Sequence, residues 1–69
     1  MDPQFDFAGD PLFFTPKIKA MLKAVILHAR SEVAKVSEPG AQALFETTAD
    51  VLGGLVKAYE HYERGSEAA

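Results

Sequence analysis

His28 and Glu32 are a pair of residues whose types and spacing could support chemistry. Residues four apart lie on one face of a helix, so the imidazole and the carboxylate can meet. A metal ion needs at least one further ligand, and Asp50, the nearest candidate in a helical hairpin, is expected on the polar side. We therefore expect His28 to be a boundary residue of the core, and we expect no bound metal or other cofactor.

The second histidine, His61, lies between Glu60 and Glu63, a cluster that partly matches a carboxylate-histidine metal helix. Di-iron bundles use the spacing Glu-x-x-His, repeated on separate helices. The residue three positions before His61 is Ala58, so the spacing does not fit. His61 also falls opposite the apolar side of its predicted helix, and we expect it to be exposed to solvent.

Hydroxyl groups at Ser31, Thr47 and Thr48 are candidate nucleophiles by residue type alone. An activated nucleophile needs an adjacent base, and the sequence shows no paired serine and histidine. Paired carboxylates for acid–base catalysis need a pocket, for which a chain of 69 residues has little room. The sequence therefore predicts a protein that is not an enzyme.

Three cations, Lys19, Lys23 and Arg30, cluster at the edge of the polar side of the first predicted helix. The charge changes sign along the chain: residues 1–16 carry −3, residues 17–36 carry +4 and residues 37–69 carry −4, which sum to the net charge of −3. This alternation favours packing against acidic segments of the same protein. Weak nucleic-acid binding through the basic face remains an alternative, without a recognisable motif to support it.

Two predicted helices position these residues. The first is expected over about residues 16–36, with Thr15 as N-cap and Pro16 at the first helical position. Its apolar residues recur at spacings of three and four, which is typical of an amphipathic helix. They are Ile18, Leu22, Val25, Ala29, Val33 and Val36.

The second helix is expected over about residues 39–64, with Gly65 ending it and a disordered tail at 66–69. Gly53 and Gly54 in its middle cost about 1 kcal/mol each relative to alanine, which indicates close approach of another helix or a kink. Its apolar arc spans roughly 180° of the helix surface. From this arc we predict the core and dimer interface: Leu44, Phe45, Thr48, Val51, Leu52, Leu55, Val56, Tyr59 and Tyr62.

The width of this arc predicts an oligomer. A helix that packs against one neighbour needs an apolar stripe only a little wider than about 100°. The second helix can cover two neighbours, of which the first helix is one, so a second hairpin should supply the other. The predicted fold is an all-α, two-helix antiparallel hairpin with an N-terminal aromatic arm, dimerising into a four-helix bundle. Whether the assembly is a dimer or a tetramer stays open.

The arm covers residues 1–15 and holds four of the five phenylalanines, with a capped helical turn expected at Asp10 and Pro11. Its aromatic rings either cover the end of the subunit's own core or reach across a dimer. Leu27, framed by alanines on the far side of the first helix, suggests a second contact surface with Phe13 and Phe14 of the arm. We expect the arm, a neighbouring subunit or an external partner to cover Leu27.

Composition supports a small folded module: 48% of residues are hydrophobic and cysteine is absent. We find no signal peptide and no apolar run near the ~20 residues of a membrane span, so we expect a cytoplasmic protein without a membrane partner. The predicted function is a homo-oligomeric helical interaction or structural module that binds itself and a further protein. The alternative is a bundle that binds a small ligand or metal through His28, Glu32, Tyr59 or Tyr62.

Overall fold

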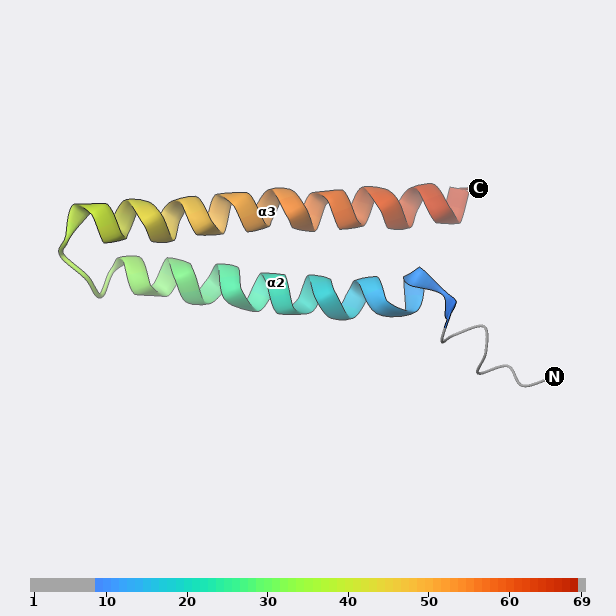
Figure 1. The fold of residues 1–69 in the computed structure, drawn as a ribbon, viewed down its shortest axis with the longest axis horizontal. Helices are drawn as coiled ribbons and strands as arrows, with labels where there is room; N and C mark the ends of the chain where they lie inside the picture. Colours follow the sequence, from blue (N-terminus) through green and yellow to red (C-terminus); the bar gives the residue numbers. More distant parts are fainter. Residues whose placement is uncertain (1–8, 69) are drawn as a thin grey trace.

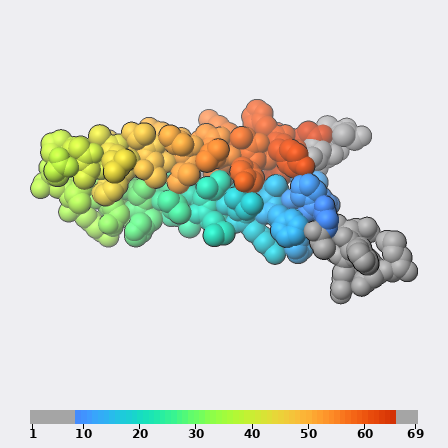
Figure 2. All heavy atoms as spheres, viewed as in Figure 1, coloured from blue at the N-terminus to red at the C-terminus, as the bar shows by residue number. Residues whose placement is uncertain are grey.

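The computed structural model describes residues 9–68, and two long helices account for nearly all of them. α2 spans Pro11–Val33 and α3 spans Pro39–Ala68. The helices are antiparallel and lie side by side along their length, joined by residues 34–38 (Figures 1 and 2). Over the described residues the prediction of an all-α helical hairpin is confirmed. Residues 1–8 of the predicted arm lie outside the described part of the chain.

α2 begins at Pro11, so the predicted start at Pro16 is wrong. Asp10 is the N-cap, and its carboxylate accepts a hydrogen bond of 2.9 Å from the amide of Leu12. Pro11 occupies the first helical position, where a missing N–H leaves no hydrogen bond unmade. Pro16 removes one backbone hydrogen bond inside the helix but does not end it. The capped turn expected at Asp10 and Pro11 is therefore the first turn of α2 itself.

The start of α3 is fixed by the side chain of Glu38. Its two carboxylate oxygens accept hydrogen bonds from the amides of Gly40 at 3.0 Å and Ala41 at 2.7 Å. The side-chain amide of Gln42 donates a bond of 2.8 Å to the carbonyl of Val36. These bonds satisfy backbone groups that a helix start and a turn leave without helical partners.

Both helices end at residues other than those predicted. α2 ends at Val33, with Ala34 as C-cap, and not at Val36. α3 continues through Gly65 to Ala68, which contradicts the predicted end at residue 64 and makes residues 66–68 helical where a disordered tail was expected. The described glycines all lack a positive φ, so Gly65 does not adopt the left-handed cap that its position suggested.

The two helices contact each other through a seam of residues spaced alternately three and four apart, the pattern of a coiled coil. Every one of these residues is buried or half-buried. They are Leu12, Thr15, Lys19, Leu22, Ile26, Ala29 and Val33 on α2, and Gln42, Phe45, Ala49, Leu52, Val56, Tyr59 and Glu63 on α3. The most buried apolar positions are Ile26, Ala29, Ala49 and Val56, with Leu22 and Leu52 packed against them.

The regular seam corrects part of the predicted stripe on α2. Leu22, Ala29 and Val33 face α3 as expected. Ile18 and Val25, however, are 39% and 47% exposed, and the buried residue between Leu22 and Ala29 is Ile26. The prediction followed every apolar residue at helical spacing, whereas α2 carries two adjacent apolar lines and only one of them meets α3.

Candidate interaction faces

One broad face of the hairpin is apolar and belongs to neither helix alone. It is formed by Phe14, Ile18, Met21 and Val25 of α2 and by Leu44, Val51, Leu55 and Tyr62 of α3, all of them exposed. We call this set the apolar face. Each residue comes one position before a seam residue. Successive residues are rotated by about 100° around a helix axis. Because the two helices run in opposite directions, the residues that precede the seam residues lie on the same side of the hairpin in both helices.

An open hollow confirms that the two lines share one side of the hairpin. Pro11 and Thr15 of α2 line it together with Ala58, Tyr59 and Tyr62 of α3, and its volume is about 310 Å³. Pro11, Ala58 and Tyr62 each precede a seam residue by one position, as the residues of the apolar face do. The apolar face therefore continues into a hollow at the open end of the hairpin, which lies opposite the connection.

Three polar residues interrupt the apolar lines near the connection. The hydroxyl of Thr48 donates a hydrogen bond of 2.8 Å to the carbonyl of Leu44, so it needs no partner from outside the helix. Glu32 pairs with Lys35 at 2.9 Å, and this hydrogen bond and charge hold the pKa of Glu32 below its ordinary value of 4.5. His28 is exposed. Among the described residues, Glu32 is the one carboxylate on these lines.

The opposite broad face consists of the residues that follow the seam by one position, and it is rich in charge. It contains Lys23, Leu27 and Arg30 of α2 and Glu46, Asp50, Gly53, Lys57, Glu60 and Arg64 of α3. We call this set the charged face. Lys23 lies 3.9 Å from Glu60 across the two helices. The hairpin thus separates apolar and charged surface onto two opposite sides.

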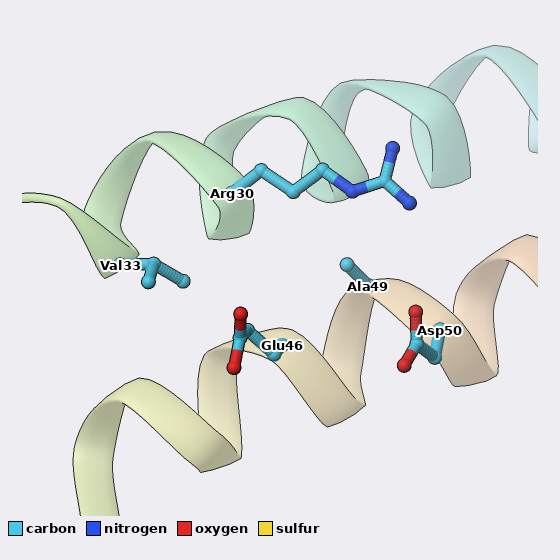
Figure 3. A pocket seen from close by; sticks show the side chains of 5 residues that line it. All are labelled: Arg30, Val33, Glu46, Ala49 and Asp50. Atoms are coloured by element: carbon cyan, nitrogen blue, oxygen red, sulfur yellow. The ribbon is translucent and has the colours of Figure 1, made fainter. Parts of the chain in front are cut away.

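Two open hollows of about 410 Å³ each lie along the charged face. Figure 3 shows the one nearer the connection, where Arg30 extends along α2 and the carboxylates of Glu46 and Asp50 approach from α3, with Ala49 between the helices. The other hollow is bordered by charged and apolar side chains of both helices. Its lining comprises Lys23, Ile26, Leu27, Arg30, Gly53, Val56, Lys57 and Glu60.

Leu27 and Gly53 lie on the charged face, and Gly54 lies on the side of α3 away from α2. Leu27 is 70% exposed. A side chain added at Gly53 or Gly54 would meet nothing within 4 Å, so α2 does not approach them closely. The predicted close approach of a helix at these glycines therefore does not come from within the hairpin. Phe13 and Phe14 lie in the first turn of the helix that contains Leu27, about 20 Å from Leu27 along the axis at 1.5 Å per residue. These two phenylalanines therefore cannot cover Leu27 of their own subunit.

The predicted second contact surface is divided by the fold. Phe13 and Phe14 meet edge to face, with ring centroids 5.1 Å apart, and the Lys17 ammonium lies 4.3 Å from the centre of the Phe13 ring. Phe14 belongs to the apolar face, whereas Phe13 follows the seam by one position, as Leu27 does. The three residues therefore do not form one continuous patch on a single hairpin.

A charged cluster that the sequence analysis missed lies inside the seam, at the open end. The Lys19 ammonium is 2.6 Å from the Glu63 carboxylate, and both side chains are less than one-fifth exposed. Thr15, predicted as a cap, instead donates its hydroxyl to Glu63. The bonds from Lys19 and then Thr15 hold the pKa of Glu63 below its ordinary value of 4.5. We predicted Lys19 at the edge of the polar side of its helix. Its spacing from the other seam residues of α2 could have indicated that it faces α3.

The residues considered for chemistry do not assemble into a reaction centre in the described part of the chain. His61 is exposed on the outer side of α3. No group of three or more histidine, aspartate or glutamate side chains between residues 9 and 65 is arranged to hold a metal ion. What the described residues do present is surface: an apolar face with a hollow at the open end, and a charged face with two further hollows.

Comparison with known proteins adds no family: no family model matches the chain, and neither a curated protein nor a solved structure matches it significantly. Neither of the described helices contains a stretch long and apolar enough to cross a membrane.

Proposed function

We propose that this protein is a homodimeric helical module that acts through protein–protein contacts and not through catalysis. Two hairpins pair through their apolar faces and form a four-helix bundle. The two charged faces then lie on the outside of the bundle, where they bind another protein. The observation that carries this proposal is the separation of surface types, with apolar side chains on one broad side of the hairpin and charged side chains on the other.

The need for a second copy follows from the thickness of the hairpin. Its two helices lie side by side, so across them the hairpin is a single helix thick, about 10–12 Å with side chains. Stable domains bury apolar surface between two layers of secondary structure, and a single hairpin supplies only one layer. A second hairpin placed on the apolar face supplies the missing layer and covers eight exposed apolar side chains on each copy.

The dimensions of the apolar face match those of a stable dimer interface. Two helices side by side, each about 10–12 Å in diameter, give the hairpin a width of about 20 Å, and the 23 residues of α2 extend over about 35 Å at 1.5 Å per residue. Their product is a flat area of about 700 Å², close to the roughly 800 Å² that each partner contributes to a standard interface. The apolar face is therefore large enough to hold two copies together.

The polar groups on the apolar face are compatible with burial in a dimer. The hydroxyl of Thr48 is already bonded within its own helix. Glu32 and His28 lie toward the connection, and Glu32 has Lys35 as its partner. Charge elsewhere is concentrated on the charged face, so pairing through that face would desolvate many ionic groups at a high cost. The apolar face is the side on which pairing leaves the fewest charges without water.

The charged face offers features that suit a protein partner. Three cations, Lys23, Arg30 and Lys57, surround a hollow that also exposes Leu27 beside Gly53. An apolar side chain of a partner can enter where glycine leaves space, while acidic residues around it meet the cations. Glu46, Asp50 and Glu60 on the same face would repel the continuous phosphates of a nucleic acid, so a protein is favoured.

The proposal is tested by placing one carboxylate on each side of α3. Val51→Asp puts a charge on the apolar face, and Ala43→Asp puts the same charge on an exposed residue that follows the seam residue Gln42 by one position, on the side of the charged face. Val51 is 58% exposed in the single chain, so the hairpin itself accommodates aspartate there. Sedimentation equilibrium should show a dissociated Val51→Asp chain and a dimeric Ala43→Asp chain, because burying an unpaired charge is costly.

Two results would contradict the proposed arrangement. Equal masses for the two variants would mean that the apolar face is not the interface. Leu27→Asp provides the second check, because Leu27 lies on the outer side of the proposed bundle. Loss of the dimer in Leu27→Asp with retention in Val51→Asp would show that the copies pair through their charged faces.

A further inference from the structure

We propose that the charged face binds an amphipathic helix of a partner protein, with an apolar side chain of that helix seated over Gly53 and charges of opposite sign on its two sides. The receptor is the hollow of about 410 Å³ that Leu27 and Gly53 line together, which we call the central hollow. The partner named here is that of the proposed function, and its binding rests on that function only in taking the charged face as an outer surface. It does not require the chain to be a dimer.

The central hollow has an apolar floor and an apolar side. Ile26 and Val56, two buried residues of the seam, form the floor. Leu27, which is 70% exposed, borders the hollow from α2, and Gly53 borders it from α3. A side chain added at Gly53 would meet nothing within 4 Å, so the space beside Leu27 is open to a side chain from outside. An apolar side chain of a partner would cover Leu27 there, as anchor residues do at the centre of interfaces.

The rim of the central hollow has an excess of positive charge. Lys23 and Lys57 lie on the side toward the open end, and Arg30 lies toward the connection. One carboxylate, Glu60, also lines the hollow and lies 3.9 Å from Lys23. Between residues 9 and 65, neither Lys57 nor Arg30 forms an ion pair. Carboxylates placed beside the anchor of a partner would therefore meet cations that the hairpin leaves unpaired.

The sign of the charge changes along α3 on the two sides of the anchor position. Lys57 lies one turn after Gly53, toward the open end, and Asp50 lies one turn before it, toward the connection. Figure 3 shows the carboxylates of Glu46 and Asp50 approaching the space beside Arg30. These carboxylates would repel a segment that is acidic throughout. The complementary partner carries a carboxylate on the open-end side of its anchor and a cation on the connection side.

The spacing of these charges suits a partner helix. Lys57 and Asp50 are seven residues apart, about 10.5 Å along the axis at 1.5 Å per residue. A helix lying along the hairpin presents side chains one turn before and one turn after its anchor at the same spacing. Acidic residues are favoured near the N-terminus of a helix and basic residues near its C-terminus, so the partner's N-terminus points toward the open end. A hollow open along both helices accommodates such a helix, whereas small molecules bind in more enclosed sites.

A synthetic helical peptide and two leucine variants test the anchor position. The probe is an alanine-rich peptide of about 16 residues that carries glutamate, leucine and lysine at successive turns, in that order. Gly53→Leu fills the anchor space, and Gly54→Leu adds the same side chain on the side of α3 away from α2. A Cβ at either glycine meets nothing within 4 Å, so the hairpin accommodates both variants. By fluorescence anisotropy, Gly53→Leu should weaken peptide binding at least about tenfold and Gly54→Leu less than about twofold.

Two charge reversals test the predicted orientation of the partner. Lys57→Glu changes a cation on the rim of the central hollow, and Arg64→Glu makes the same change on the same face, outside the hollow. Lys57→Glu should weaken binding of the peptide about three- to tenfold more than Arg64→Glu, because its effect is a local contact with the glutamate of the peptide. Equal weakening by the two variants would show general attraction of charge and would overturn the proposed placement.

The remaining outcomes separate this binding site from the proposed dimer. Absence of peptide binding to the native chain, or equal affinities of the Gly53→Leu and Gly54→Leu chains, would overturn the inference. Val51→Asp leaves the charged face unchanged, so it should bind the peptide as the native chain does even where sedimentation shows it dissociated. A native chain that binds the peptide but sediments as a monomer would contradict the dimer alone. A native dimer that does not bind the peptide would contradict this inference alone.

Discussion

Truncation of Leu55 to alanine should weaken the dimer much more than the same truncation of Leu27. Both side chains are exposed in the single hairpin, Leu55 by 44% and Leu27 by 70%. The structure of one hairpin therefore gives no reason why truncating Leu55 should change association more than truncating Leu27. In the proposed bundle the exposed part of Leu55 becomes buried against the second copy. Leu27 stays on the outside, which makes Leu27→Ala the matched control.

The expected magnitude follows from the exposed fraction of Leu55. Complete burial of a leucine side chain contributes about 1.5–3 kcal/mol, so the 44% that remains exposed in the hairpin corresponds to roughly 0.7–1.3 kcal/mol. A symmetric dimer buries two copies, which gives about 1.3–2.6 kcal/mol. Leu55→Ala should therefore raise the dissociation constant of the dimer about 10- to 80-fold. Leu27→Ala should change it less than about twofold, as expected for an external surface position.

Sedimentation equilibrium over a range of protein concentrations measures both dissociation constants directly. Thermal unfolding is less informative, because Leu55 is more than half covered within its own hairpin and its truncation also destabilises the subunit. The comparison of dissociation constants removes this contribution as long as both variants remain folded, which circular dichroism establishes. Equal dissociation constants for the two variants would refute the assignment of the apolar face as the interface.

Three further predictions concern the hairpin itself. Ile26→Ala should lower the free energy of unfolding by about 2–5 kcal/mol in urea titrations, because Ile26 is only 8% exposed, and a loss below about 1 kcal/mol would show that the seam is not the core. Glu38→Ala should cost about 1 kcal/mol by removing the two bonds that cap α3, and an unchanged urea midpoint would contradict this capping role. Since the folded pKa of Glu63 lies below its ordinary value of 4.5, its contribution is fully present above that pH and is lost as the pH falls through the lower, folded value. The stability difference between the native chain and Glu63→Gln should accordingly shrink below pH 4.5, and a difference that grows with acidification would be inconsistent with the Lys19–Glu63 pair.

Hydrophobic periodicity predicted the hairpin because two amphipathic segments joined by a short connection have few other ways to bury their stripes. The first residue of α2 was harder to predict, because Asp10–Pro11 and Thr15–Pro16 both carry the pattern of a cap followed by proline. The structure uses the first and tolerates Pro16 within the helix. Local cap signals alone do not decide between two such sites when one lies a single turn or so before the other.

The division of the apolar residues into two faces was only partly predictable. The wide arc of α3 indicated two neighbours, and the structure indeed separates it into residues such as Leu52, which face α2, and residues such as Leu55, which do not. On α2 the same division was missed. Lys19 occupies a seam position where a hydrophobic residue would be expected, and its partner Glu63 is 44 residues away in the sequence. A pairing over that distance becomes visible only when the register between the helices is known.

The mass of the native chain in solution tests the central claim most directly. Sedimentation equilibrium at micromolar concentration, with helicity followed by circular dichroism, should give a folded species at twice the 7.5 kDa of one chain. A well-folded, helical species that remains at 7.5 kDa under the same conditions would show that one layer of two helices is stable alone, and it would contradict the proposed dimer.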